Sequence, residues 1–141
     1  MKYIFFILVI FFSMVIQAQV AEVSKKDTEQ TREPVISKTM YGTASYYADK
    51  FNGRETANGE IYDSEKMTAA CNVLPLGTWI RVTNLSNNRS VVVKTNDRLH
   101  ARMKRIVDLS RAAAKKLGYI NKGLTKVKVE VLKKVETSKK R

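Results

Sequence analysis

The sequence contains few residues that form cross-links or bind metal ions. It has one cysteine, Cys71, and one histidine, His100, in 141 residues. A single cysteine excludes an intramolecular disulfide, so Cys71 is a buried small hydrophobe, an intermolecular link or a reactive thiol, and we favour burial. The sequence shows no cluster of metal ligands and no phosphate-binding glycine loop, so we expect no cofactor and no metal site.

Phenylalanine is scarce beyond the N-terminus, because four of the five lie within residues 1–12. There a charged start, an apolar run over residues 3–16 and the pair Gln17-Ala18 are typical of a secretory signal. A membrane-spanning helix would need about 20 apolar residues. We therefore expect cleavage near Ala18 and a soluble protein in the periplasm or the extracellular envelope, without a stable membrane anchor. The remaining core then depends on valine, isoleucine, leucine, tyrosine and Trp79, which favours β-structure.

Acidic residues are only half as numerous as basic ones, 13 against 26, and the formal net charge is +13. Such a charge attracts polyanions, and for a cytosolic chain nucleic acid would be the expected partner. Export removes that expectation, so we predict no nucleic-acid partner. The charge then indicates retention by anionic envelope polymers, with simple solubility as the alternative.

Composition divides the chain into four parts. Residues 1–18 form the predicted signal peptide, and residues 19–38 are polar, contain Pro34 and show no apolar period, so we expect a disordered linker. Residues 39–132 are long enough for one small domain, and we expect a monomer. Residues 133–141 form a basic tail.

The domain carries mainly strand signals and one helix signal. The helix should begin at the N-cap Ser110 and stop at Gly118. We expect strands from alternating or β-branched residues over 42–47, 78–83, 90–95, 106–107 and 126–131, with a hairpin joining the second and third. The prediction is a mainly β fold, a small closed barrel with one packed helix.

Acidic side chains in this domain are the candidates for acid–base chemistry. Five are set aside because they lie in polar loops, at a turn or on the expected wet face of the last strand: Asp49, Glu55, Asp63, Glu65 and Glu130. Glu60, Asp97 and Asp108 remain.

These three acids differ in their local setting. Asp97 follows a buried strand where it enters a loop, a position that holds a side chain rigidly, although an Asn-Asp turn paired with Arg98 is the simpler interpretation. Glu60 follows a turn and is by itself an ordinary loop glutamate. Asp108 lies two residues before Ser110, so we expect it to hold the helix entrance.

A run of ordered motifs then changes the interpretation. The motifs are GTASYY at 42–47, FNGRETANGEIYD at 51–63, MTAA at 67–70, LPLGT at 74–78, RVTNL at 81–85, NDR at 96–98 and RIVDLSRAAA at 105–114. Together they resemble the rare lipoprotein A (RlpA) family. The resemblance implies a double-psi β-barrel and a lytic transglycosylase that acts on peptidoglycan, preferentially on glycan strands without stem peptides.

The resemblance also assigns residues. The family's functional acids correspond to Glu60 and Asp97, and a third functional position, usually histidine, corresponds to Cys71. A thiol does not supply the charge of an imidazole near neutral pH, so either that histidine is dispensable or the protein is impaired. His100 could reach Asp97 from the following loop, although an exposed loop histidine is the simpler interpretation.

Substrate binding is assigned to five residues. Asn58 and Arg98 belong to the motifs of the two acids, and Tyr47, Tyr62 and Trp79 are candidate sugar-stacking platforms, with a place in the core as the alternative.

The implied reaction is a non-hydrolytic cut between N-acetylmuramic acid and N-acetylglucosamine that leaves a 1,6-anhydro end. We expect Asp97 to act first as acid and then as base, and Glu60 to stabilise positive charge on the sugar or to position it. An expansin-like protein that binds and loosens glycan without cutting it is the alternative, and a hydrolase is a third possibility.

Overall fold

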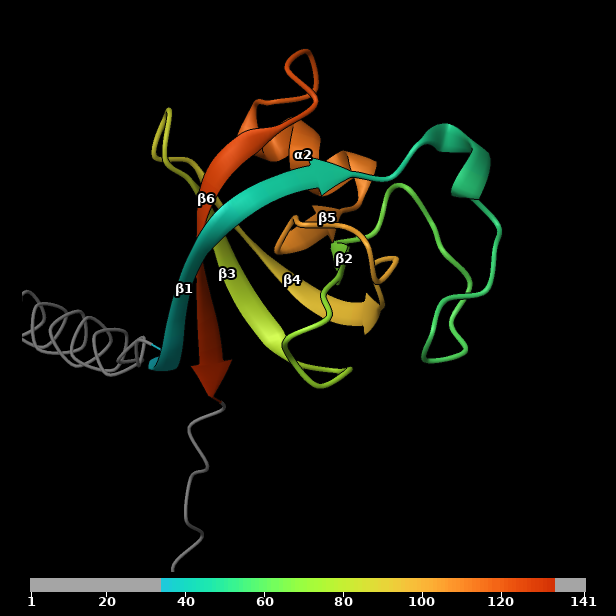
Figure 1. Ribbon diagram of the computed structural model, residues 1–141, viewed down its shortest axis with the longest axis horizontal. Helices are drawn as coiled ribbons and strands as arrows, with labels where there is room; N and C mark the ends of the chain where they lie inside the picture. The colour runs from blue at the N-terminus through green and yellow to red at the C-terminus, as the bar shows by residue number, and fades with distance from the viewer. Residues whose placement is uncertain (1–33, 134–141) are drawn as a thin grey trace, which may run out of the picture. The chain divides into compact units, whose positions relative to one another are not determined.

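Six strands close into a barrel in the order β1-β5-β2-β4-β3-β6 (Figure 1). The computed structural model describes residues 34–133. The strands are β1 (Val35–Tyr46), β2 (Thr68–Ala70), β3 (Trp79–Asn84), β4 (Ser90–Asp97), β5 (Val107–Leu109) and β6 (Thr125–Lys133). The 3-10 helix η1 (Asp49–Phe51) follows β1, and the helix α2 (Arg111–Leu117) separates β5 from β6. The predicted closed barrel with one helix is confirmed.

Strand pairing in the barrel is mixed. β1 pairs with β5 and β2 pairs with β4 in parallel, whereas the other four pairings are antiparallel. The predicted hairpin is present as β3 and β4, with Trp79 opposite Lys94 and Thr83 opposite Ser90. Four long strands, β1, β6, β3 and β4, therefore form one continuous ladder, and the three-residue strands β2 and β5 complete the barrel.

The core follows the two-residue period of the long strands. Ile80 and Val82 of β3, and Val127 and Val129 of β6, are fully buried. Alternate side chains of a strand point to opposite faces, so these branched residues fill the barrel interior. Glu130, which we expected on the wet face of β6, is instead buried: its strand partners are Thr39 of β1 and Arg81 of β3, and its carboxylate pairs with Lys128 (3.0 Å).

Helix α2 has the predicted ends. The Ser110 hydroxyl oxygen accepts a hydrogen bond from the Ala113 N–H (3.3 Å), and Gly118 ends the helix with φ of +76°. That left-handed conformation favours glycine, and its N–H donates to the carbonyls of Ala114 and Lys115. Within residues 34–133, no helix has the length and apolar character needed to cross a bilayer.

The observed elements differ from the predicted ones at several places. The strand predicted at 106–107 is β5 at Val107–Leu109, η1 was not predicted, and β6 includes Lys133 of the predicted tail. β1 begins at Val35, so residues 35–38 of the predicted linker are strand, because β6 offers partners as far as Lys133. β2 was missed, since three residues inside a loop-rich stretch carry no period of their own. The predicted signal peptide, linker residues 19–33 and tail residues 134–141 lie outside the described residues.

Candidate active site

A cleft of about 540 Å³ opens beside the ends of β1 and β4. It is lined by Tyr46, Tyr47, Ala48, Phe51, Arg54, Glu55, Thr56, Tyr62, Ala70, Asp97, Arg98, Leu99, His100, Met103, Arg105 and Asp108. These residues come from the end of β1 with η1, from the loop before β2 and the end of β2, and from the segment that runs from the end of β4 into β5. The cleft therefore brings together segments that are far apart in the sequence.

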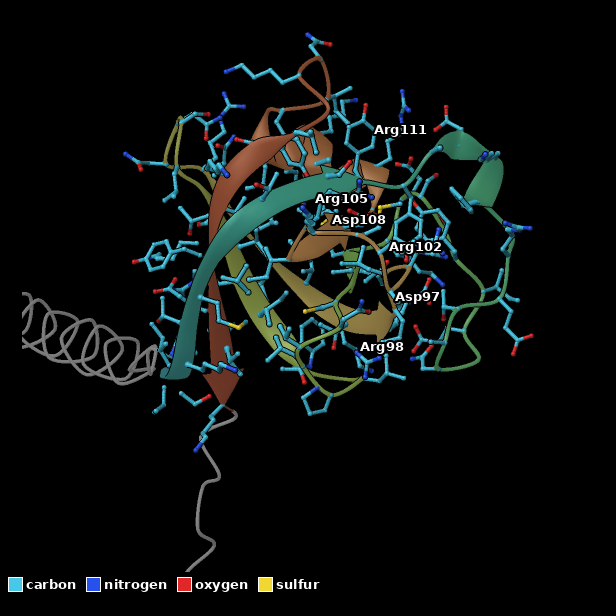
Figure 2. The ribbon with its side chains drawn as sticks, viewed as in Figure 1. Asp97, Arg98, Arg102, Arg105, Asp108 and Arg111 are labelled. Carbon is cyan, nitrogen blue, oxygen red and sulfur yellow. The ribbon has the colours of Figure 1, made fainter. Side chains whose placement is uncertain are left out.

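Strand register explains why two acids face this cleft. Ala70 of β2 is the partner of Asp97 in β4 and also of Asp108 in β5. Neighbouring strands lie about 4.8 Å apart, which places the backbones of the two acids about 10 Å apart with an alanine between them. Figure 2 shows both acids on the side of the barrel from which the loop before β2 extends. Ala70 itself lines the cleft between the two acids.

The Asp97 carboxylate is held by three donors. Its Oδ2 accepts a hydrogen bond from the Tyr47 hydroxyl (2.6 Å), and its Oδ1 accepts from the N–H groups of Ala57 (2.9 Å) and Arg98 (2.8 Å). The donors come from the residue that follows β1, from the loop before β2 and from the residue after Asp97 itself. Asp97 is thus oriented by three separate parts of the chain, as a reacting group must be.

The Tyr47 hydroxyl remains a hydrogen-bond donor to Asp97 throughout. Burial, and then the hydrogen bond to Asp97, raise the pKa of the Tyr47 hydroxyl far above its ordinary value, so it stays protonated. Its ring stacks on Tyr62 with centroids 4.5 Å apart. Tyr62 is only 3% exposed, so its ring supports the cleft wall behind Tyr47 and offers no open face for a sugar.

Glu60 lies beside the cleft but does not line it. Its Oε2 accepts a hydrogen bond from the Asn96 side chain (3.0 Å), and its own N–H donates to the Asn58 Oδ1 (3.1 Å). The side chains of Asn96 and Asn58, and more weakly Lys94 and Lys66, lower the pKa of the Glu60 carboxyl below its ordinary value. Glu60 is therefore ionised at neutral pH and suits a role as an acceptor better than one as a proton donor.

Three of the predicted substrate-binding residues have other contacts. The Asn58 Oδ1 also accepts from the Thr56 hydroxyl (2.7 Å), which shapes the turn before Glu60. The Arg98 guanidinium donates to the backbone carbonyls of Cys71 and Leu74 and thus holds that segment in place. Trp79 is exposed but lies on β3, outside the cleft lining. Of the three, only Arg98 borders the cleft.

Cys71 is fully buried, as predicted, and its side chain packs in the barrel core. Its backbone N–H donates to the Asp97 carbonyl (3.1 Å), so Cys71 supports the site through the main chain. His100 is an exposed loop residue that also lines the cleft, and its Nδ1 accepts from the Arg102 N–H (3.3 Å). The only imidazole of the chain is therefore at the cleft but not at the position of Cys71.

Asp108 does not have the structural role that we expected. Ser110 caps helix α2, whereas Asp108 accepts hydrogen bonds from Arg105, Nε to Oδ1 (2.7 Å) and Nη2 to Oδ2 (2.8 Å). The prediction was wrong because Val107 and Leu109 point into the core, which turns Asp108 to the opposite face of β5. The alternation of apolar and charged residues over 107–109 is visible in the sequence, and it indicates that Asp108 points away from the core.

The amino-acid sequence of this chain is similar to those of known proteins. Residues 39–129 match the family described as lytic transglycolase. Relatives named endolytic peptidoglycan transglycosylase RlpA include that of Pseudomonas aeruginosa, 55% identical over 97 residues (69% of this chain and 28% of the relative). That of Haemophilus influenzae is 50% identical over 91 residues (64% and 32%). The chain spans less than half the length of these relatives.

Two solved structures share the fold at lower identity. One is a Streptomyces papain inhibitor, 23% identical with a TM-score of 0.57, which matches 72% of this chain and 100% of the inhibitor. The other is the apo expansin of Clavibacter michiganensis, 23% identical with a TM-score of 0.55, over 68% of this chain and 51% of the expansin. With the family match, these similarities confirm the predicted double-psi β-barrel.

Proposed function

This chain belongs to the lytic transglycolase family, and on that basis we propose that it cuts peptidoglycan glycan strands without consuming water. The observation that carries the proposal is Asp97, an acid held by three donors at one wall of an open cleft. The relatives are named endolytic peptidoglycan transglycosylases, which gives the substrate class.

Asp97 performs the proton transfers in this proposal. The reaction starts with a protonated Asp97, which gives its proton to the oxygen between N-acetylmuramic acid and N-acetylglucosamine as the C1–O bond breaks. The C6 hydroxyl of the muramyl residue then bonds to C1, and the Asp97 carboxylate takes the hydroxyl proton. One carboxyl group acts as acid and then as base, the proton returns to Asp97, and a 1,6-anhydro end remains.

Tyr47 and Glu60 support Asp97 in different ways. Tyr47 keeps its proton and directs it at Oδ2, which orients the carboxyl group through both protonation states. Glu60 holds Asn96, the residue before Asp97, from the loop that also supplies the Ala57 N–H. We assign Glu60 a positioning role, because it does not line the cleft in which the sugar would react.

We place this activity outside the cytoplasm, where peptidoglycan lies. The N-terminal residues 1–18 have the pattern of a secretory signal, and the domain has twice as many basic as acidic residues. That charge favours retention by anionic envelope polymers. We propose a monomer that acts on glycan strands and has no nucleic-acid partner.

A glycan-loosening protein without cleavage is the second candidate. The observation in its favour is Cys71, which is buried at the position where the family usually has histidine. The fold likeness to expansin is compatible with this candidate but at 23% identity says nothing about activity.

Digestion of purified sacculi separates these functions by their products. We expect the wild-type protein to release fragments with 1,6-anhydro ends, detected by mass spectrometry. Asp97→Asn should reduce their release by about 10²–10⁴-fold, because it removes the proton donor. Glu65→Gln is the control, since Glu65 is an exposed acid outside the cleft and should retain wild-type release.

The other product patterns contradict the proposal. New reducing ends would identify a hydrolase. Binding to sacculi with no new ends would identify the loosening protein.

A further inference from the structure

We propose that Arg105 and Asp108 form a sugar-binding pair on the wall of the cleft that faces Asp97 across Ala70. The pair would hold the glycan while Asp97 acts on the linkage. The identity of the ligand rests on the proposed function, whereas the position of the pair rests on the structure alone.

The register of the strands places Arg105 and Asp108 at the cleft. Asp97 and Asp108 are the two strand partners of Ala70, and all three residues line the cleft together with Arg105. In Figure 2, Arg105 and Asp108 lie together near β5, and Asp97 lies near the end of β4. Of the acids in the cleft lining, only Asp97 and Asp108 lie on strands, whereas Glu55 lies on a loop.

A purely structural role explains Asp108 poorly. Its ion pair joins residues three positions apart in one segment, so it connects no separate elements of the fold. Helix α2 is capped by Ser110 and does not need Asp108. An ion pair that retains contact with solvent contributes little to stability, about 0–1 kcal/mol. The side chains of Arg105 and Asp108 are 28% and 13% exposed to solvent, which leaves the pair accessible from the cleft.

The chemistry of the pair suits a sugar. A guanidinium has five N–H groups, and Asp108 occupies two of those on Arg105, so three donors remain for a ligand. The Asp108 oxygens keep further lone pairs. Sugar hydroxyls donate and accept, so a fixed donor–acceptor pair can bind two of them at once. Because the ion pair already fixes both side chains, less conformational entropy is lost on binding.

Apolar residues of the cleft complete this surface. Tyr46, Leu99 and Met103 line the same cleft as the pair. Carbohydrate sites combine apolar contact for a ring face with a few fixed polar groups, as small-molecule sites do in general. The wall around Arg105 and Asp108 has both components.

Glycan binding without turnover tests the pair directly. In an Asp97→Asn background, the affinity for peptide-free glycan chains prepared from sacculi is measured by calorimetry. We expect Asp108→Asn to weaken binding by about tenfold or more, since it removes a charged acceptor. Arg105→Lys should also weaken binding, because lysine keeps the charge but loses the planar fork. Glu65→Gln makes the same change of charge as Asp108→Asn, lies outside the cleft, and should leave the affinity unchanged.

Kinetics and stability complete the test. In the active protein, Asp108→Asn should raise KM for glycan more than it lowers kcat, with the melting temperature nearly unchanged.

Unchanged affinity in both Asp108→Asn and Arg105→Lys would overturn the proposal, and so would a loss of affinity that only accompanies unfolding. Normal cleavage by Asp108→Asn would reject the pair but keep the transglycosylase. Weakened binding with no anhydro ends from the wild type would reject the transglycosylase but keep the pair.

Discussion

The long strands and the short strands of the barrel contribute to different properties of the protein, namely its stability and its cleft. β1, β6, β3 and β4 form an antiparallel ladder whose inward side chains, such as Ile80 and Val129, are fully buried. β2 and β5 have three residues each and contribute Ala70 and Asp108 to the cleft. The difference indicates that most of the apolar burial lies in the long strands, to which Val107 and Leu109 of β5 add, whereas the chemistry lies on the short strands and at the strand ends.

The two regions are also held together differently. Around the cleft, polar side chains bind the backbone of the loops. Asn72 accepts from the Leu99 N–H (2.8 Å) and donates to the Leu99 carbonyl (3.1 Å), and Arg98 binds two carbonyls of the segment before β3. Contacts of this kind fix loop geometry while they contribute little to the core. Substitutions in the long strands should therefore change the free energy of unfolding, whereas substitutions around the cleft should change the activity or the local order of the loops.

The largest effect on stability is expected in the long strands. Ile80→Ala removes a fully buried side chain from β3 and should lower the free energy of unfolding by about 2–5 kcal/mol. Chemical denaturation measures this loss. A loss below about 1 kcal/mol would show that the long strands do not dominate the stability.

Tyr47→Phe should have the opposite pattern, with activity lost and stability kept. Phenylalanine preserves the stack on Tyr62 but removes the hydroxyl that donates to Asp97 Oδ2. We expect the rate of anhydro-end formation to fall about ten- to a hundredfold, the value of one hydrogen bond to a charged group. Rates near those of the wild type would show that the two backbone donors are sufficient to orient Asp97.

A smaller and local effect is expected for Asn72→Ala. The loss of both bonds to Leu99 should destabilise the segment after β4 by about 1–2 kcal/mol without unfolding the barrel. Hydrogen exchange of the Met103 N–H, which donates to the His100 carbonyl, should become faster. Asn121→Ala, at an exposed turn beyond α2, is the matched control. Equal exchange rates in the two variants would contradict the anchoring role of Asn72.

The smallest effect is expected for Glu60→Gln, and it depends on pH. Because the pKa of Glu60 is lowered in the folded protein, the ionised form stabilises the fold at neutral pH, and this contribution is lost as the pH falls through the folded pKa. The wild type should melt higher than the variant at pH 7, by about 2 °C or less, and the difference should vanish in acid. Melting curves between pH 7 and pH 2 measure it. A constant difference would show that the charge of Glu60 is not involved.

Local signals in the sequence predicted much of the fold. Ser110 and Gly118 mark the ends of α2, because capping depends on residues within one helical turn. The alternation around Val127 and Val129 predicted β6 and its buried face. The ordered motifs, through their resemblance, indicated the double-psi barrel and directed attention to Asp97.

The candidate site was only partly predictable. Asp97 lies in the cleft as expected, but Tyr62 is buried, the Arg98 guanidinium binds backbone, and Glu60 lies beside the cleft. A side chain that a motif identifies can point in several directions, and its own sequence neighbours do not select one of them.

The sequence by itself determined the local elements, the burial of Cys71 and the acids that could react, because each depends on residue type and short-range pattern. Only the tertiary structure decided that Asp108 faces Asp97 across Ala70. That arrangement requires β4, β2 and β5 to lie side by side with a bulge in the register of β2 and β4. Barrel closure sets such a register through contacts between distant segments, and no local pattern of residues encodes it.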